Sequence, residues 1–162
     1  MQNTFFRESL IRTMIPFFTA VVFGHLIHAS DRHFSAVATG ECAVYTGTSE
    51  GNDPSQQVMM TICRDHNQLT IESRSKGIGG TSVMRFDGVL NPSGTNEATL
   101  VVTEVFSLEP NPGWIACHDD VLRLQALEDG KTIVGYSTSR ACSDHARLTL
   151  HRDCSKLRCS HF

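Results

Sequence analysis

Residues 121–139 read VLRLQALEDGKTIVGYSTS, and this stretch decides how the rest of the chain is interpreted. Its apolar residues, such as Leu122 and Leu124, alternate with polar neighbours. An alternation with a period of two places apolar side chains on one face of a strand and polar ones on the other. Asp129-Gly130 is a strong hairpin signal, because both residues tolerate the positive φ angles of a tight turn. The stretch therefore predicts two antiparallel strands, each with one face directed toward a core.

The same alternation recurs along the chain, between clusters of glycine, proline, asparagine and aspartate that are typical of turns. Helical spacing of apolar residues appears nowhere after the first forty residues. We predict nine strands, at 42–48, 57–64, 68–75, 81–87, 98–106, 114–118, 121–127, 132–139 and 146–152. Short strands joined by short turns favour an all-β fold, a single antiparallel barrel or sandwich of about eight or nine strands.

The N-terminus differs in kind from this pattern. Arg7 and Arg12 precede a mostly apolar run at 14–27, and small residues follow it. A basic flank, an apolar run and small residues form the order of a cleavable signal peptide. We therefore interpret residues 1–38 as a signal peptide, cleaved after Ala29 or after Ala38. A retained membrane anchor is the alternative, since the uncharged window is about as long as a spanning helix of ~20 residues requires.

The remaining chain fits one domain, with residues 39–153 as the β domain and residues 154–162 as a basic C-terminal tail tied down by a disulfide. The whole chain has a formal charge of −3, and loss of the leader removes one more base than acid. A mildly acidic domain has no general attraction for nucleic acid or anionic lipid. We expect no nucleic-acid partner, and membrane contact only through an uncleaved leader.

All six cysteines lie after the predicted leader. An even number of cysteines in a short exported domain indicates disulfides rather than zinc, because no pair has the two-residue gap of a zinc knuckle. Cysteines on consecutive strands can face each other, and the remaining spacings favour pairs that follow one another along the chain without overlap. We predict a secreted or periplasmic protein with three disulfides, Cys42–Cys63, Cys117–Cys142 and Cys154–Cys159.

Motifs of the common enzyme classes are absent from the sequence, including the nucleophile elbow, the zinc-protease helix and the phosphate loop. We assign no catalytic residue, no cofactor and no metal ligand, and we favour a non-enzymatic protein. One cluster offers an alternative. A bond between the two central cysteines brings together polar residues that could bind a metal ion or support hydrolysis, namely His118, Asp119, Asp120, Asp144 and His145. The competing interpretation is that these are hydrophilic strand ends beside a structural disulfide.

Trp114 follows the rigid loop formed by residues 109–113, which could present its indole to a partner. A buried tryptophan that anchors the core is the alternative. The candidate binding residues are therefore Trp114, His118, Asp144 and His145. We expect an exported β domain that binds a protein or a small apolar ligand through its loops or a barrel mouth. A metal-binding or hydrolytic site is the second hypothesis, and a structural envelope or matrix component is the third.

Overall fold

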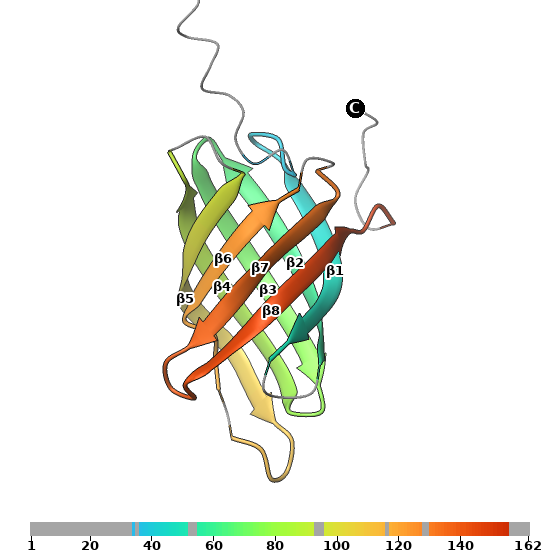
Figure 1. Cartoon of the computed structure of the whole chain (residues 1–162), viewed down its shortest axis with the longest axis vertical. Coiled ribbons are helices and arrows are strands. Elements are labelled where there is room, and N and C mark those ends of the chain that lie inside the picture. Colours follow the sequence, from blue (N-terminus) through green and yellow to red (C-terminus); the bar gives the residue numbers. More distant parts are fainter. Residues whose placement is uncertain are drawn as a thin grey trace, which may run out of the picture. The chain divides into compact units, whose positions relative to one another are not determined.

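The computed structural model describes residues 34, 36–51, 55–92, 96–115, 117–127 and 130–155. The chain divides into two units, Met1–Asp31 and Arg32–Phe162, and all the described residues lie in the second. The predicted leader lies outside the described residues. Within the described part, the fold is an all-β barrel of eight strands (Figure 1): β1 (Cys42–Glu50), β2 (Gln56–Asp65), β3 (Gln68–Gly77), β4 (Gly80–Leu90), β5 (Glu97–Pro110), β6 (Val121–Ala126), β7 (Thr132–Ser139) and β8 (Asp144–Arg152).

The barrel is a closed antiparallel meander, in which each strand pairs with its neighbours in sequence and β8 returns to pair with β1. Closure pairs every strand with a neighbour on each side, although β5 beyond Val101 forms a ladder with β4 alone. Of the two predicted architectures, a barrel or a sandwich, the barrel is confirmed. None of the described residues forms a helix that is long and apolar enough to cross a membrane.

The half of the barrel in which β1 begins is filled by apolar side chains, and we call it the apolar end. Its inward residues are fully or almost fully buried: Ala43, Tyr45, Ile62, Leu69, Ile71, Phe86, Leu90, Ala98, Leu100, Leu124, Ile133 and Leu150. Burial of each large side chain contributes about 1.5–3 kcal/mol. This half is therefore a packed core. Its residues are the apolar members of the alternating pattern in each strand.

A segment that precedes β1 also belongs to this core. Phe34, Ala36 and Val37 are buried, although we predicted that the domain starts at residue 39. The hydroxyl of Tyr45 lies 3.0 Å from the carbonyl oxygens of Ala36 and Gly130, so it can donate to either. The segment that closes the apolar end is thus tied to the barrel by packing and by hydrogen bonding.

Two disulfides cross-link the described residues, and both were predicted. Cys42 and Cys63 lie directly opposite each other on β1 and β2. Cys117 and Cys142 join the segment before β6 to the β7–β8 turn, with 6.0 Å between their Cα atoms. Cys154 is also disulfide-bonded, and its predicted partner, Cys159, lies outside the described residues.

The strand predicted at 114–118 was wrong. The structure extends β5 to Pro110, which pairs with Gly80 of β4, and then turns at Gly113 with a φ of 88°. Trp114 is held by a backbone hydrogen bond to Asn111 within this turn, and Cys117 is held by its disulfide. Local bonds and a covalent link therefore replace the ladder hydrogen bonds that a strand requires.

Candidate ligand-binding site

The other half of the barrel has a polar interior, and we call it the polar end. Serine side chains line it or lie buried within it: Ser49, Ser73, Ser75, Ser82, Ser137 and Ser139. They continue the same inward rows of residues that supply the core of the apolar end. On β7, for example, the inward row runs from Ile133 through Gly135 to Ser137 and Ser139. The interior therefore changes from apolar to polar along the barrel axis.

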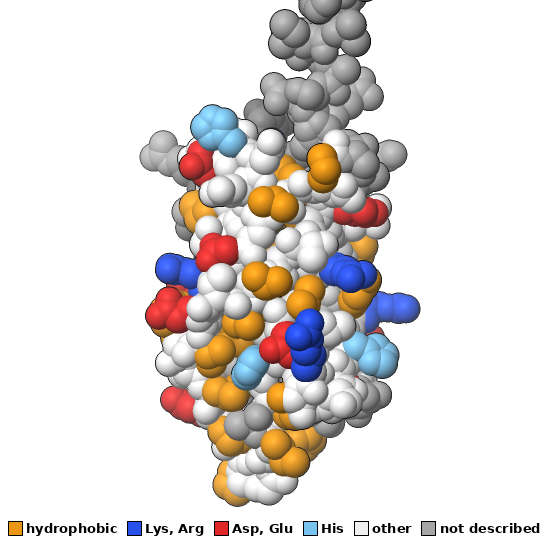
Figure 2. Space-filling view, turned by 90° about the vertical axis from the view of Figure 1, so that its left-hand side faces the viewer, with side chains coloured by type: hydrophobic (Ala, Val, Ile, Leu, Met, Phe, Trp, Pro, Cys, Tyr) orange, Lys and Arg blue, Asp and Glu red, His pale blue; other side chains and the backbone are white. Residues whose placement is uncertain are grey.

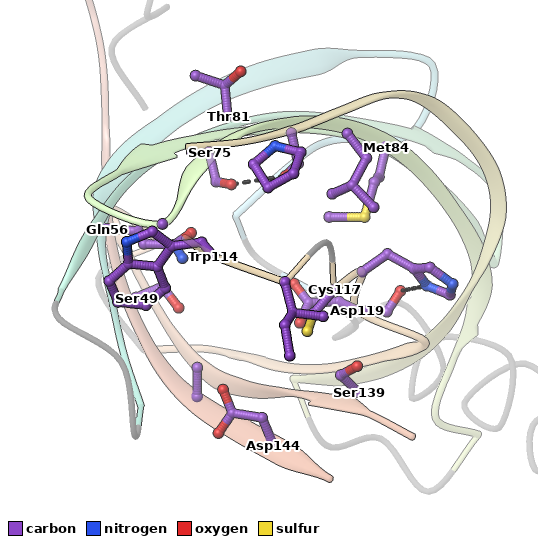
Figure 3. A pocket seen from close by; sticks show the side chains of 18 of the residues that line it. Ser49, Gln56, Ser75, Thr81, Met84, Trp114, Cys117, Asp119, Ser139 and Asp144 are labelled. Atoms are coloured by element: carbon purple, nitrogen blue, oxygen red, sulfur yellow. Dashed lines mark hydrogen bonds between the residues drawn. The ribbon is translucent and has the colours of Figure 1, made fainter. Parts of the chain in front are cut away.

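A cavity of about 110 Å³ opens at the polar end. Its walls come from β1 to β5, β7, β8 and the segment after β5, and Figure 3 shows the side chains around the opening. Trp114 lies on the side of Ser49 and Gln56, and Asp119 lies on the side of Ser139. A molecule of liquid water takes about 30 Å³, so the cavity accommodates a group of only a few heavy atoms.

Asp119 enters the cavity from the irregular segment before β6. The next residue fixes this segment between two strands, because the backbone N–H of Asp120 donates to Thr138 (2.8 Å) and its carbonyl accepts from Val102 (2.9 Å). The side chain of Asp120 accepts a further hydrogen bond from the backbone N–H of Arg140 at 2.5 Å. These bonds hold the backbone beside Asp119 rigidly, so its carboxyl group has a defined position at the mouth.

Burial raises the pKa of Asp119 above its ordinary value of 3.8. A hydrogen bond from Ser137, which is itself 1% exposed, opposes this rise. The neighbouring carboxylate of Asp144 raises the pKa further, His118 lowers it, and Asp120 raises it slightly. The dominant cause is desolvation, which makes the ionised carboxylate an unfavourable occupant of this position unless a positive group approaches it.

Ser139 presents an unused hydrogen-bonding group to the same cavity. Its side chain is 7% exposed, and its hydroxyl has no hydrogen-bond partner among the described residues. By contrast, Ser75 and Ser82 satisfy each other across β3 and β4, with their hydroxyl oxygens 2.7 Å apart. A buried hydroxyl without a partner costs about 1–3 kcal/mol. A ligand that hydrogen-bonds Ser139 recovers part of this free energy.

Around the cavity, the polar end carries an apolar rim. Figure 2 shows hydrophobic side chains gathered at the lower tip of the barrel, where β5 extends beyond its neighbours. Ile115 is 83% exposed, and Ile78 in the β3–β4 turn is also exposed. Leu108 and Pro110 of β5 line the opening itself. Exposed apolar residues grouped beside a cavity are typical of binding surfaces.

Trp114 belongs to this rim and is half-buried, so it is neither the core anchor nor the fully presented side chain that the sequence left open. Its indole lies against Gly79 in the β3–β4 turn, where an added Cβ would come within 3.4 Å of a ring atom. The ring therefore packs against this turn at van der Waals distance and forms part of the cavity wall.

The structure brings together three of the four predicted binding residues. Trp114, His118 and Asp144 all line the cavity, whereas His145 is exposed on the outer surface. His145 follows Asp144 on β8, and successive residues of a strand point to opposite faces. Sequence reasoning missed Ser139 and its fellow serines, although their i, i+2 spacing was a usable signal.

The five residues of the hypothetical metal or hydrolytic site converge only in part. His118, Asp119 and Asp144 line the cavity, but Asp120 and His145 do not. The imidazole of His118 lies 3.5 Å from the carboxylate of Asp120. Among the residues that the structure describes, no group of three histidine, cysteine or acidic side chains is placed to hold a metal ion.

Comparisons with known proteins add no relative. No family model, curated protein or solved structure matches this chain.

A second hollow, of about 710 Å³, lies on the outer wall over β4 to β8. Its aromatic residue is already engaged, because Arg123 donates to the hydroxyl of Tyr136 at 2.9 Å and its guanidinium lies 5.7 Å from the ring centre. Neither group is buried, so water competes with any ligand there. The cavity at the polar end is the better candidate, because it combines enclosure with an unsatisfied hydroxyl and a desolvated carboxyl group.

Proposed function

We propose that this protein is an exported binding protein whose barrel takes a small amphipathic ligand at the polar end. The observation that carries the proposal is the unpaired, nine-tenths buried hydroxyl of Ser139 in a cavity with an apolar rim. The ligand's polar head enters the cavity, and its apolar body lies on Trp114 and Ile115. This proposal narrows the small apolar ligand expected from the sequence to one with a polar head.

The size of the cavity supports this division. Pockets that enclose a whole drug-sized ligand measure about 300–1,000 Å³, and this cavity measures about 110 Å³. The apolar end is filled by its own side chains, so a ligand has no room to pass deeper into the barrel. A head group of a few heavy atoms fits, and the rest of the ligand remains at the rim.

Export is the second part of the proposal, and two observations support it. The disulfides of the barrel are consistent with an oxidising environment, and the N-terminus has the order of a signal peptide. Of the two predicted cleavage positions, we propose the one after Ala29. A cut after Ala38 removes Phe34, Ala36 and Val37, which are buried in the core. N-terminal sequencing of the exported protein tests this, and a mature chain that starts at Thr39 contradicts it.

A fluorescence titration tests the binding function. Trp114 is the single tryptophan of the chain, so its emission reports occupancy of the mouth. We expect a saturable change with at least one of three phenyl compounds, phenethylamine, 2-phenylethanol and 3-phenylpropionate, accompanied by a higher melting temperature. These ligands share one apolar body and differ in the head group. No saturable signal and no thermal shift with any of the three contradicts the proposed function.

A pair of variants locates the site. Trp114→Ala removes the aromatic wall of the cavity and should weaken binding about tenfold, as measured by calorimetry. Tyr136→Ala is the matched control, because it removes a partly exposed aromatic side chain from the outer hollow. It should leave the affinity unchanged. A larger loss with Tyr136→Ala than with Trp114→Ala places the site on the outer wall instead.

A further inference from the structure

We infer that the head group held at the polar end is a cation, and specifically a primary ammonium group. The inference rests on the proposed function and names the chemical class of its ligand. Three carboxyl side chains line the cavity, those of Asp119, Asp144 and Glu109, together with the imidazole of His118. None of the described residues that line it is a lysine or an arginine. The cavity therefore favours positive charge and disfavours negative charge.

Charge alone does not define a site, and Ser139 supplies the independent observation. Its hydroxyl oxygen is buried, unpaired and directed into the cavity (Figure 3). A hydroxyl oxygen accepts hydrogen bonds, and an ammonium group brings three N–H donors and no acceptor. Two of these donors can reach acceptors of different kinds, the carboxylate of Asp119 and the hydroxyl of Ser139. A quaternary ammonium has no N–H donor and cannot use Ser139 in this way.

The environment of the Asp119 carboxylate in the ligand-free protein explains why a cationic head group should bind tightly. Asp119 is desolvated and faces like charge from Asp144 and Asp120, with a hydrogen bond from Ser137 as partial compensation. The imidazole of His118 and the hydroxyl of Ser137 compensate the carboxylate only in part, so a cationic ligand supplies the further opposite charge that it needs. Hydrogen bonds to charged groups contribute more than those between neutral groups. An ammonium head should therefore bind more tightly than a hydroxyl head of the same size.

The three phenyl ligands test this order by calorimetry at neutral pH and low ionic strength. We expect phenethylamine to bind about tenfold or more tightly than 2-phenylethanol, because a charged hydrogen bond exceeds a neutral one by about one factor of ten in affinity. We expect 3-phenylpropionate to bind most weakly. Added salt should reduce the preference for the amine.

Two variants assign the preference to residues. Asp119→Asn keeps the shape of the side chain and removes its charge, so it should bring the affinity for phenethylamine to within about threefold of that for 2-phenylethanol. Asp65→Asn is the control, because it removes the same charge from a side chain that is 81% exposed at the far end of β2. It should leave the preference of about tenfold intact. Ser139→Ala should weaken phenethylamine binding while its structure remains folded.

A pH titration of the wild-type protein tests the preference for a cation, and the Asp119→Asn variant tests whether Asp119 is its source. Affinity for phenethylamine should fall as the pH drops through the raised pKa of Asp119, while affinity for 2-phenylethanol changes little. Asp144, Asp120, Glu109 and His118 lie close by, and protonation of any of them acts in the same direction. The Asp119→Asn variant, titrated in parallel, should lose the Asp119 step.

The outcomes separate the inference from the proposal on which it depends. If 2-phenylethanol binds as tightly as phenethylamine, or 3-phenylpropionate binds most tightly, the cationic head group is wrong and amphipathic binding stands. If Asp119→Asn retains the full preference for the amine, the assigned residue is wrong. If none of the three compounds binds, the proposed function fails and the inference fails with it.

Discussion

The two ends of one barrel use the same strands for opposite purposes. At the apolar end, the inward rows carry Ile62, Ile71, Phe86 and Leu150, and the hydroxyl of Tyr45 has carbonyl partners. At the polar end, the rows carry serines, and the hydroxyl of Ser139 has none among the described residues. Burial of apolar side chains stabilises the first end. The second end has fewer such side chains, and its polar groups face a cavity, so it contributes less to stability. Unsatisfied groups of this kind are typical of functional sites.

The largest effect should come from the apolar end. Phe86 is fully buried in the core, so Phe86→Ala should lower the free energy of unfolding by about 3–5 kcal/mol. Ile115→Ala at the polar end should change it by less than about 0.5 kcal/mol, because exposed side chains contribute little. Urea denaturation measures both. Similar losses for the two variants contradict the division between a structural end and a functional end.

The Cys42–Cys63 and Cys117–Cys142 disulfides sharpen the comparison, because one lies at each end. Their sequence separations are 21 and 25 residues, so the chain-entropy model predicts similar losses of about 2–4 kcal/mol when either is removed. Only the Cys117→Ala/Cys142→Ala double variant should also weaken phenethylamine binding, since this disulfide anchors the segment that carries Asp119. Weaker binding in the Cys42→Ala/Cys63→Ala variant speaks against this assignment. Denaturation and calorimetry on both proteins give the answer.

Removing one hydroxyl group from each end should change the stability of the protein in opposite directions. Tyr45→Phe deletes a bonded hydroxyl and should lower stability by about 1–3 kcal/mol, since it leaves buried carbonyls unpaired. Ser139→Ala deletes an unpaired one and should raise stability by about 1 kcal/mol, although it weakens ligand binding. The melting temperatures of both variants give the sign. A destabilising Ser139→Ala means that its hydroxyl is satisfied in the free protein.

The smallest expected effects are changes in the pH dependence of stability caused by two carboxylates, Asp119 and Asp87. Asp119 has a raised pKa, so the folded state binds more protons than the unfolded state, and its contribution to stability falls as pH rises above about 3.8. Asp119→Asn should therefore be more stable than the wild type at neutral pH and equal to it at low pH. Urea midpoints across a pH series measure the difference, and a difference that is independent of pH excludes Asp119 as its source.

Asp87 on the outer wall is a matched carboxylate whose pKa is shifted in the opposite direction. Hydrogen bonds from Thr103 and Thr70 lower its pKa, with a smaller contribution from Arg85. It therefore stabilises the fold above about pH 3.8, and this contribution is lost as the pH falls through its lowered pKa. Asp87→Asn should be less stable than the wild type at neutral pH, and the same series of urea midpoints measures it.

Much of the fold was predictable because it depends on short-range patterns. Alternation identified eight strands, and the placement of Cys42 and Cys63 on consecutive strands gave a disulfide that the register confirms. The prediction of a strand around Trp114 failed because the alternation there is not accompanied by ladder partners. The Gly113 turn and the Cys117 disulfide organise that segment instead.

The site was predictable only in part, because it depends on how distant rows meet. The disulfide spacing predicted that His118 and Asp144 lie near each other. It did not predict that His145 points outward, which depends on its position directly after Asp144 on a strand. The i, i+2 spacing of the inward serines is visible in the sequence, but the sequence does not show which end of the barrel is open. The sequence alone also does not reveal that Ser139 lacks a partner, since that depends on every side chain around it.

The most direct test of the central claim is a map of ligand-induced chemical shifts in ¹⁵N-labelled protein titrated with phenethylamine. We predict that the largest changes occur at the polar end, at the indole N–H of Trp114 and the amides of Asp119 and Ser139. The amide of Tyr45 at the apolar end should remain unchanged. Changes centred on Tyr45, or on Tyr136 in the outer hollow, contradict the assignment of the polar end as the binding site.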